Sequence, residues 1–116
     1  MRPDLSRYTP FAISVMRSDE EVALVVVGEL DLESADKLER NVSQLRAPDV
    51  TRIVLNLRQV EFIDSSGLRV LLNLRNDAER NGHALTLIPP APAVRRVFEI
   101  TGTRTLFDWR EDRPES

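Results

Sequence analysis

The sequence predicts a single α/β domain whose mostly parallel, mixed sheet has an antiparallel edge strand and packs with about four helices. Short apolar runs typical of strands alternate with stretches in which apolar residues recur every three or four positions, as on one face of a helix. This alternation favours parallel strands joined by right-handed helical crossovers. A hairpin near the start of the chain would add the antiparallel edge. With 116 residues, one hydrophobic core is expected.

The strands are expected at four or five places. Residues 11–16 and 22–30 form the hairpin, and its turn at residues 18–21 lacks the Asn-Gly or Asp-Gly pair that would fix the register of the first strand. Residues 52–57 and 84–88 are short runs rich in aliphatic residues, as in buried parallel strands. Leu106 and Phe107 are expected to add a further edge strand.

Three helices follow from the apolar spacing and from their stop signals. The first is expected over residues 34–46, and the second begins at Ser66 and ends at Asn81 and Gly82. The third begins at Pro92, a residue suited to a first helical turn, and ends at Gly102. Residues 1–10 are expected to be a flexible leader, residues 11–109 the domain, and residues 110–116 a polar tail.

The composition argues against an enzyme and against a cofactor or metal. The chain has no cysteine, its only histidine is His83, and its four glycines are isolated, so the patterns of thiol nucleophiles, transition-metal sites and phosphate-binding loops are missing. A net charge of −3 gives no reason to expect nucleic acid or an anionic membrane as a partner. The longest apolar run, residues 22–27, is too short to cross a bilayer. We therefore expect a cytoplasmic protein.

The most informative stretch is VEFIDSSGLRVLL at residues 60–72. We expect Phe62 and Ile63 to leave the sheet, and the small polar residues 64–67 to form the junction with the second helix. Such residues often cap a helix, which is the simpler interpretation. The junction also follows a strand of an α/β sheet, where ligands of such sheets bind. Both interpretations are open at this point.

An exposed serine at a helix N-terminus is physically suited to carry phosphate. The helix dipole favours negative charge there by roughly 0.3 to 1 kcal/mol. Phosphorylation would add about −1.5 to −2 charges beside Asp64, so a partner that fits the neutral serine would meet an anionic group instead. The stretch therefore predicts a charge switch that acts on binding without unfolding the protein.

Four motifs together resemble the STAS domain of bacterial anti-sigma factor antagonists. They are GELD at residues 28–31, IVLNL at 53–57, DSSGL at 64–68 and RVFEITG at 96–102, and the resemblance extends from residue 11 to about residue 107. It implies a STAS-like fold. It also implies a regulator that binds, in its unphosphorylated form, an anti-sigma factor that is itself a serine kinase, and so releases a sigma factor.

The resemblance assigns roles to individual residues. The kinase would phosphorylate Ser65, the first serine after the aspartate, and a serine phosphatase would reset it. The partner-binding residues would be Asp31, Asp64, Ser65, Ser66, Gly67 and Leu68.

Alternatives remain open for the whole chain and for single residues. The domain could be a constitutive docking module of a transporter or signalling assembly, without a phospho-switch. Asp31 could cap a helix instead of contacting a partner. Leu68 has the helical spacing of a core residue relative to Leu71 and Leu72.

Overall fold

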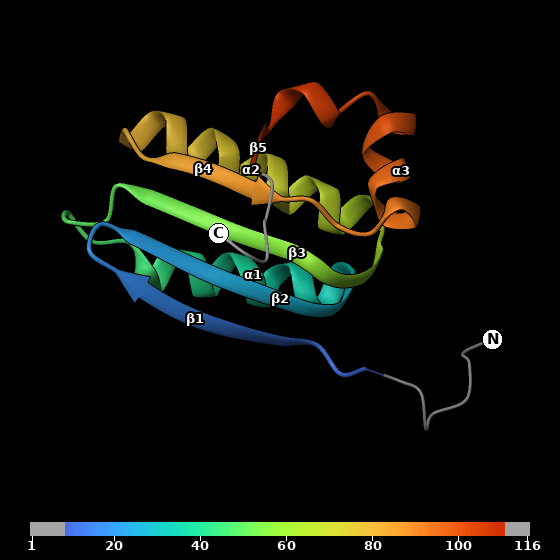
Figure 1. The fold of residues 1–116 in the computed structure, drawn as a ribbon, viewed down its shortest axis with the longest axis horizontal. Coiled ribbons are helices and arrows are strands. Elements are labelled where there is room, and N and C mark those ends of the chain that lie inside the picture. The colour runs from blue at the N-terminus through green and yellow to red at the C-terminus, as the bar shows by residue number, and fades with distance from the viewer. Residues whose placement is uncertain (1–8, 111–116) are drawn as a thin grey trace.

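The computed structural model describes residues 9–110 and arranges five strands in one sheet, in the order β1-β2-β3-β4-β5 (Figure 1). β1 runs antiparallel to β2, and the other neighbouring pairs are parallel. The mixed, mostly parallel sheet with an antiparallel edge strand is therefore confirmed. The strands are β1 (Ala12–Ser18), β2 (Glu21–Leu30), β3 (Arg52–Ile63), β4 (Ala84–Ile88) and β5 (Asp108–Trp109).

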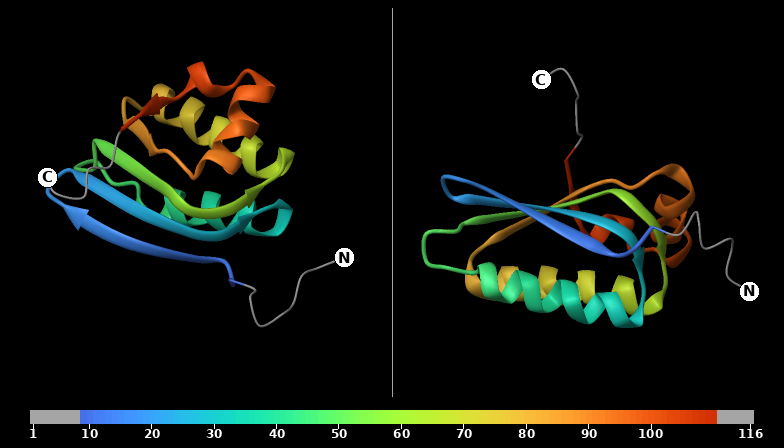
Figure 2. Two further views of the ribbon diagram at one scale, coloured as in Figure 1. Left: turned by 45° about the vertical axis from the view of Figure 1, so that its right-hand side comes forward. Right: turned by 90° about the horizontal axis from the view of Figure 1, so that it is seen from below.

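Two long helices, α1 (Leu32–Leu45) and α2 (Ser65–Asn81), lie side by side on one face of the sheet, as Figure 2 shows from below. The shorter α3 (Pro92–Thr101) contacts β3 and is followed by the 3-10 helix η2 (Arg104–Leu106). Over residues 9–110 there are thus three α-helices and one 3-10 helix where about four helices were expected.

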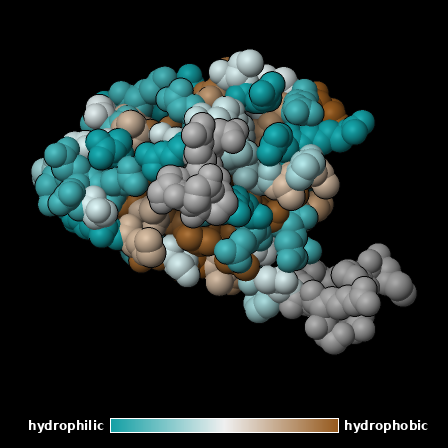
Figure 3. All heavy atoms as spheres, viewed as in Figure 1, coloured by the Kyte–Doolittle hydropathy of each residue, from teal (hydrophilic) through white to brown (hydrophobic). Residues whose placement is uncertain are grey.

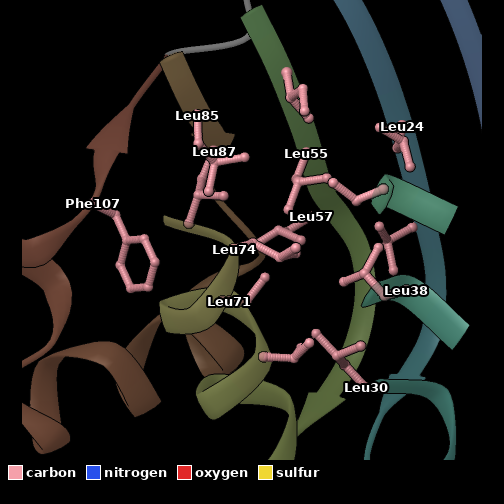
Figure 4. Close-up of a cluster of buried hydrophobic side chains, with 14 of the residues drawn as sticks. Leu24, Leu30, Leu38, Leu55, Leu57, Leu71, Leu74, Leu85, Leu87 and Phe107 are labelled. Atoms are coloured by element: carbon pink, nitrogen blue, oxygen red, sulfur yellow. The ribbon is translucent and has the colours of Figure 1, made fainter. Parts of the chain in front are cut away.

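The hydrophobic core fills the space between the sheet and the pair α1 and α2. Leucines from the strands and from both helices meet there (Figure 4). Residues 9–110 cover the opposite face of the sheet only in part: Figure 3 shows hydrophobic side chains gathered over the strands on that side, and Met16 of β1 is 69% exposed. The largest fully buried side chains are Phe98, Leu24, Leu30, Leu38, Leu55, Leu57, Leu71, Leu74, Leu87, Val22, Val26 and Val42.

The hairpin closes without the glycine that its sequence lacks. Ser18 pairs with Glu21, so only two residues connect β1 to β2. Asp19 adopts a positive φ of 53°, a conformation that aspartate tolerates better than most residues. This aspartate supplies the chain reversal and fixes the register of β1.

β3 is longer than predicted and runs to Ile63 instead of Leu57. The prediction that Phe62 and Ile63 leave the sheet is wrong, because they pair with Glu29 and Leu30 of β2. Two register shifts each place an extra residue in β3, and such bulges break the alternation of buried and exposed residues. The sequence pattern therefore stopped resembling a strand halfway along β3.

The other boundaries shift by one or two residues. α1 begins at Leu32 instead of Ser34, and α2 at Ser65 instead of Ser66, because the aspartate before each helix is its cap.

The last strand is β5 at residues 108–109, and the prediction of an edge strand at Leu106 and Phe107 is wrong. Leu106 belongs to η2. Phe107 is buried and packs edge-to-face on Phe98, with 5.8 Å between the ring centroids.

The first turn of α2 lies directly against the end of β2. The Asp64 N–H donates a hydrogen bond to the Leu30 carbonyl oxygen over 3.3 Å. A Cβ atom placed on Gly67 would lie 2.3 Å from the same oxygen and 2.9 Å from Cγ1 of Ile63. Only a residue without a side chain allows this approach, so Gly67 sets how closely α2 packs on the sheet.

Replacing Gly67 with alanine should therefore lower the free energy of unfolding. Alanine would favour an isolated helix by about 0.5 to 1 kcal/mol, but the overlap with the Leu30 backbone should cost about 1 to 3 kcal/mol or more. Urea unfolding followed by circular dichroism measures the net effect. Ser66→Ala, one residue earlier, is the control and should change stability by less than about 0.5 kcal/mol. An unchanged Gly67→Ala variant would contradict the close approach.

Candidate functional site

Two helix N-termini lie together at one edge of the sheet. β2 and β3 are neighbouring parallel strands, and their last residues, Leu30 and Ile63, pair with each other. Asp31 and Asp64, the next residues in each chain segment, are the N-caps of α1 and α2. The predicted residues Asp31 and Asp64, 33 positions apart in the sequence, therefore lie at the same edge.

Asp64 caps α2 with its carboxylate. Its Oδ1 accepts hydrogen bonds from the backbone N–H groups of Ser66, at 2.9 Å, and Gly67, at 3.0 Å. These are two of the amides that a helix leaves unpaired at its start. The cap therefore depends on Asp64 and not on the hydroxyl of Ser65.

Asp31 caps α1 through a reciprocal arrangement with Ser34. The Asp31 carboxylate accepts from the Ser34 N–H at 3.1 Å, and the Ser34 hydroxyl accepts from the Asp31 N–H at 2.8 Å. Ser34 is buried, and its hydroxyl donates to the Glu29 carbonyl oxygen at 2.6 Å. These bonds, chiefly the one from the Ser34 backbone, hold the pKa of Asp31 below its ordinary value, although partial burial opposes the shift.

Ser65 is the first residue of α2 and is exposed. Ser66 is half-buried and lines an open groove between the two helices, together with Leu32 and Asp36 of α1 and Arg69 of α2. The hydroxyl of Ser65 thus stands at the surface, beside the groove in which α1 and α2 meet.

Two of the predicted site residues lie beneath this surface. Gly67 is buried against β2, and Leu68 is 8% exposed and belongs to the hydrophobic core. For Leu68 the helical spacing indicated the position that the structure shows. Both residues pack the first turn of α2 against the interior of the protein.

Sequence reasoning missed two exposed apolar side chains near the helix starts. Leu32, in the first turn of α1, is 75% exposed, and Phe62, near the end of β3, is 48% exposed. Leu32 lies three residues before the buried Ala35, so periodicity alone would have placed it in the core. We define the helix-start patch as Asp31, Leu32, Asp64, Ser65 and Ser66.

Two kinds of feature are missing from residues 9–110. No group of three or more histidine, aspartate and glutamate side chains is positioned to hold a metal ion. No helix in this range is long and apolar enough to cross a bilayer.

The fold is that of a STAS domain. The STAS domain family model matches residues 12–115, and the chain belongs to this family. It is 31% identical over 101 residues to the anti-sigma F factor antagonist of Lysinibacillus sphaericus, covering 86% of this chain and 84% of that protein. It is 28% identical over 99 residues to the anti-sigma-B factor antagonist of Staphylococcus aureus, covering 85% and 92%.

Two solved structures of one relative have a similar fold. The unphosphorylated form of the anti-sigma factor antagonist SpoIIAA matches with a TM-score of 0.72 and 27% identity, covering 91% of this chain and 90% of that one. The phosphorylated form of SpoIIAA, a Bacillus cell fate determinant, matches with a TM-score of 0.68 and 26% identity, covering 91% and 94%. The names of all these relatives describe antagonists of anti-sigma factors.

Removing the cap of α2 should destabilise the protein, whereas removing the Ser65 hydroxyl should not. Asp64→Ala leaves two helix amides without an acceptor and should cost about 0.5 to 2 kcal/mol. Asp64→Asn keeps an acceptor oxygen and should retain most of the stability. Ser65→Ala should stay within about 0.5 kcal/mol of the original protein. Urea unfolding compares all three, and a loss in Ser65→Ala as large as in Asp64→Ala would contradict the assigned cap.

The lowered pKa of Asp31 should appear in the pH dependence of stability. A carboxylate with a depressed pKa in the folded state stabilises the fold in full above its ordinary pKa, 3.8, and loses this contribution as the pH falls through the lower value. Asp31→Asn keeps a cap oxygen but does not titrate. The stability difference between the original protein and Asp31→Asn should therefore shrink between about pH 5 and pH 2. A difference that stays constant in urea unfolding over this range would contradict the linkage.

Proposed function

We propose that this protein is an anti-sigma factor antagonist that binds an anti-sigma factor serine kinase through the helix-start patch and is released by phosphorylation of Ser65. The proposal is supported by the two named antagonists and by SpoIIAA, whose phosphorylated and unphosphorylated forms share this fold. The observation that carries it is the exposed Ser65 hydroxyl at the start of α2, in a turn whose cap is made by Asp64.

The unmodified patch suits a protein partner. It combines an exposed apolar side chain, Leu32, with two carboxylates and two serine hydroxyls. An anti-sigma factor that binds it would place an apolar pocket over Leu32 and hydrogen-bond donors opposite Asp31 and Asp64. Such a combination of an apolar anchor and complementary charge is typical of specific interfaces.

A phosphate on Ser65 would change this surface without disturbing the core. It would add about −1.5 to −2 charges next to Asp64 and close to Asp31. A partner surface arranged for the neutral hydroxyl would then hold a bulky, strongly anionic group, and its removal by a serine phosphatase would restore binding. Since Asp64 caps α2, the helix remains intact through the cycle.

Phosphorylation can be tested directly with the anti-sigma factor kinases encoded in the same genome. Each kinase is purified and incubated with this protein and ATP, and intact-mass and peptide mass spectrometry follow the product. We expect a gain of one phosphate on Ser65 with one of these kinases, no gain in Ser65→Ala, and a gain that is still located on Ser65 in Ser66→Ala. Stable binding to a kinase without any phosphate gain would support the constitutive docking module instead.

Binding measurements distinguish the contribution of the Ser65 hydroxyl from the effect of a negative charge at the same position. Ser65→Ala should bind the kinase about as tightly as the original protein and resist release by ATP. Ser65→Asp should weaken binding by at least about tenfold, or 1.4 kcal/mol, because it places a carboxylate where the partner fits a neutral group. Calorimetric titration measures both, and melting temperatures confirm that the variants are folded. Equal affinity of Ser65→Asp and the original protein would refute the charge switch.

A further inference from the structure

We propose that Arg69 holds the phosphate of phosphorylated Ser65, so that the switch contains its own counter-charge on α2. This inference rests on the proposed function, because it concerns the modified form of the same serine. Arg69 lies outside the residues assigned to the site from the sequence.

The position of Arg69 on α2 suits this role. It follows Ser65 by four residues, so the two side chains lie one above the other on the helix, with about 5 to 6 Å between their Cβ atoms. Both residues are exposed. An arginine on its long side chain can therefore reach back to a group on Ser65, in the same geometry that joins oppositely charged pairs on helices.

Arg69 also differs from the other arginines of α2. Arg75 pairs with Glu79, and Arg80 pairs with Asp77. Within residues 9–110, Arg69 makes no ion pair and no side-chain hydrogen bond. Of the two α1 carboxylates that line the groove with it, Asp36 is already paired with Arg40. The guanidinium of Arg69 is thus available for a new anion.

A phosphate on Ser65 would need such a cation. The amides of Ser66 and Gly67, which would otherwise bind an anion at a helix start, already donate to the Asp64 carboxylate. The caps Asp64 and Asp31 add negative charge close to the phosphate. Arg69 supplies positive charge and a planar set of donors that matches phosphate oxygens.

We call this contact between Arg69 and the phosphate the clamp. It gives phosphorylation a second effect on the protein surface. In the unmodified protein, Arg69 lines the groove with Leu32 and Ser66, where a partner can contact it. Bound to the phosphate, its guanidinium would turn toward Ser65 and leave the groove. Phosphorylation would then both add an anionic group to the helix-start patch and withdraw a cation from the neighbouring groove.

The test uses full-length protein in which phosphoserine is incorporated at position 65 during synthesis, so that no kinase is needed. Phosphorus NMR titration measures the second pKa of the phosphate, which is ordinarily near 6. We expect this pKa to be lower by about 0.3 to 1 unit with Arg69 present than in Arg69→Gln, because the guanidinium favours the dianion. Arg69→Lys should fall between them, since it keeps the charge and loses the fork. Arg80→Gln, at the far end of α2, is the matched control and should leave the pKa unchanged.

Melting temperatures provide the second readout. They are measured for the original protein and for Arg69→Gln, each with and without the phosphate, as in a double-mutant cycle. Phosphorylation should lower the melting temperature more in Arg69→Gln than in the original protein, and the unmodified forms of both should melt alike. A phosphate pKa and a melting shift that are the same with and without Arg69 would overturn the clamp. The kinase assay is independent of this result: a clamp without any kinase that modifies Ser65 would refute the proposed function alone.

Discussion

The candidate site depends on the close approach of α2 to the end of β2. The Leu30 carbonyl oxygen lies where the Cβ of any residue other than glycine at position 67 would collide with it. This contact holds the first turn of α2 against the strand that leads into α1. Because β2 and β3 are parallel and end together, the two helix starts then share one edge of the sheet. The absence of a side chain at Gly67 thus determines the position of the exposed Ser65.

The structural role and the proposed switch fall to different, neighbouring residues. Asp31 and Asp64 satisfy the helix amides, and Ser34 supports Asp31 from inside the protein. Ser65, between the cap and the first buried turn, has no part in these bonds. Because Ser65 makes none of the hydrogen bonds that hold the helix starts, its charge can change while the fold stays the same. This division is the physical condition for a switch that acts on binding and not on folding.

The order of strands and helices could be predicted from the sequence because the spacing of apolar residues differs between the two. The two bulges of β3 could not, since an extra residue inverts the alternation on which the prediction relies. At the candidate site, the motifs predicted Asp31, Asp64 and Ser65, and the structure places all three at the two helix starts. The helical spacing of Leu68 did indicate its core position. The sequence could not show that Gly67 lies below the surface or that Leu32 lies on it, because these positions depend on how the two helices pack.

The aromatic cluster at the end of the described chain gives the protein a built-in optical reporter. Trp109 is the only tryptophan of the sequence, and its ring meets Phe98 edge-to-face at a centroid distance of 5.2 Å. Its indole N–H donates to the Arg104 carbonyl oxygen, and β4 separates its strand from β3. Its fluorescence emission will therefore report how α3 and η2 are attached to the sheet. A loosening of this part of the molecule can be measured separately, because the helix-start patch contains no tryptophan.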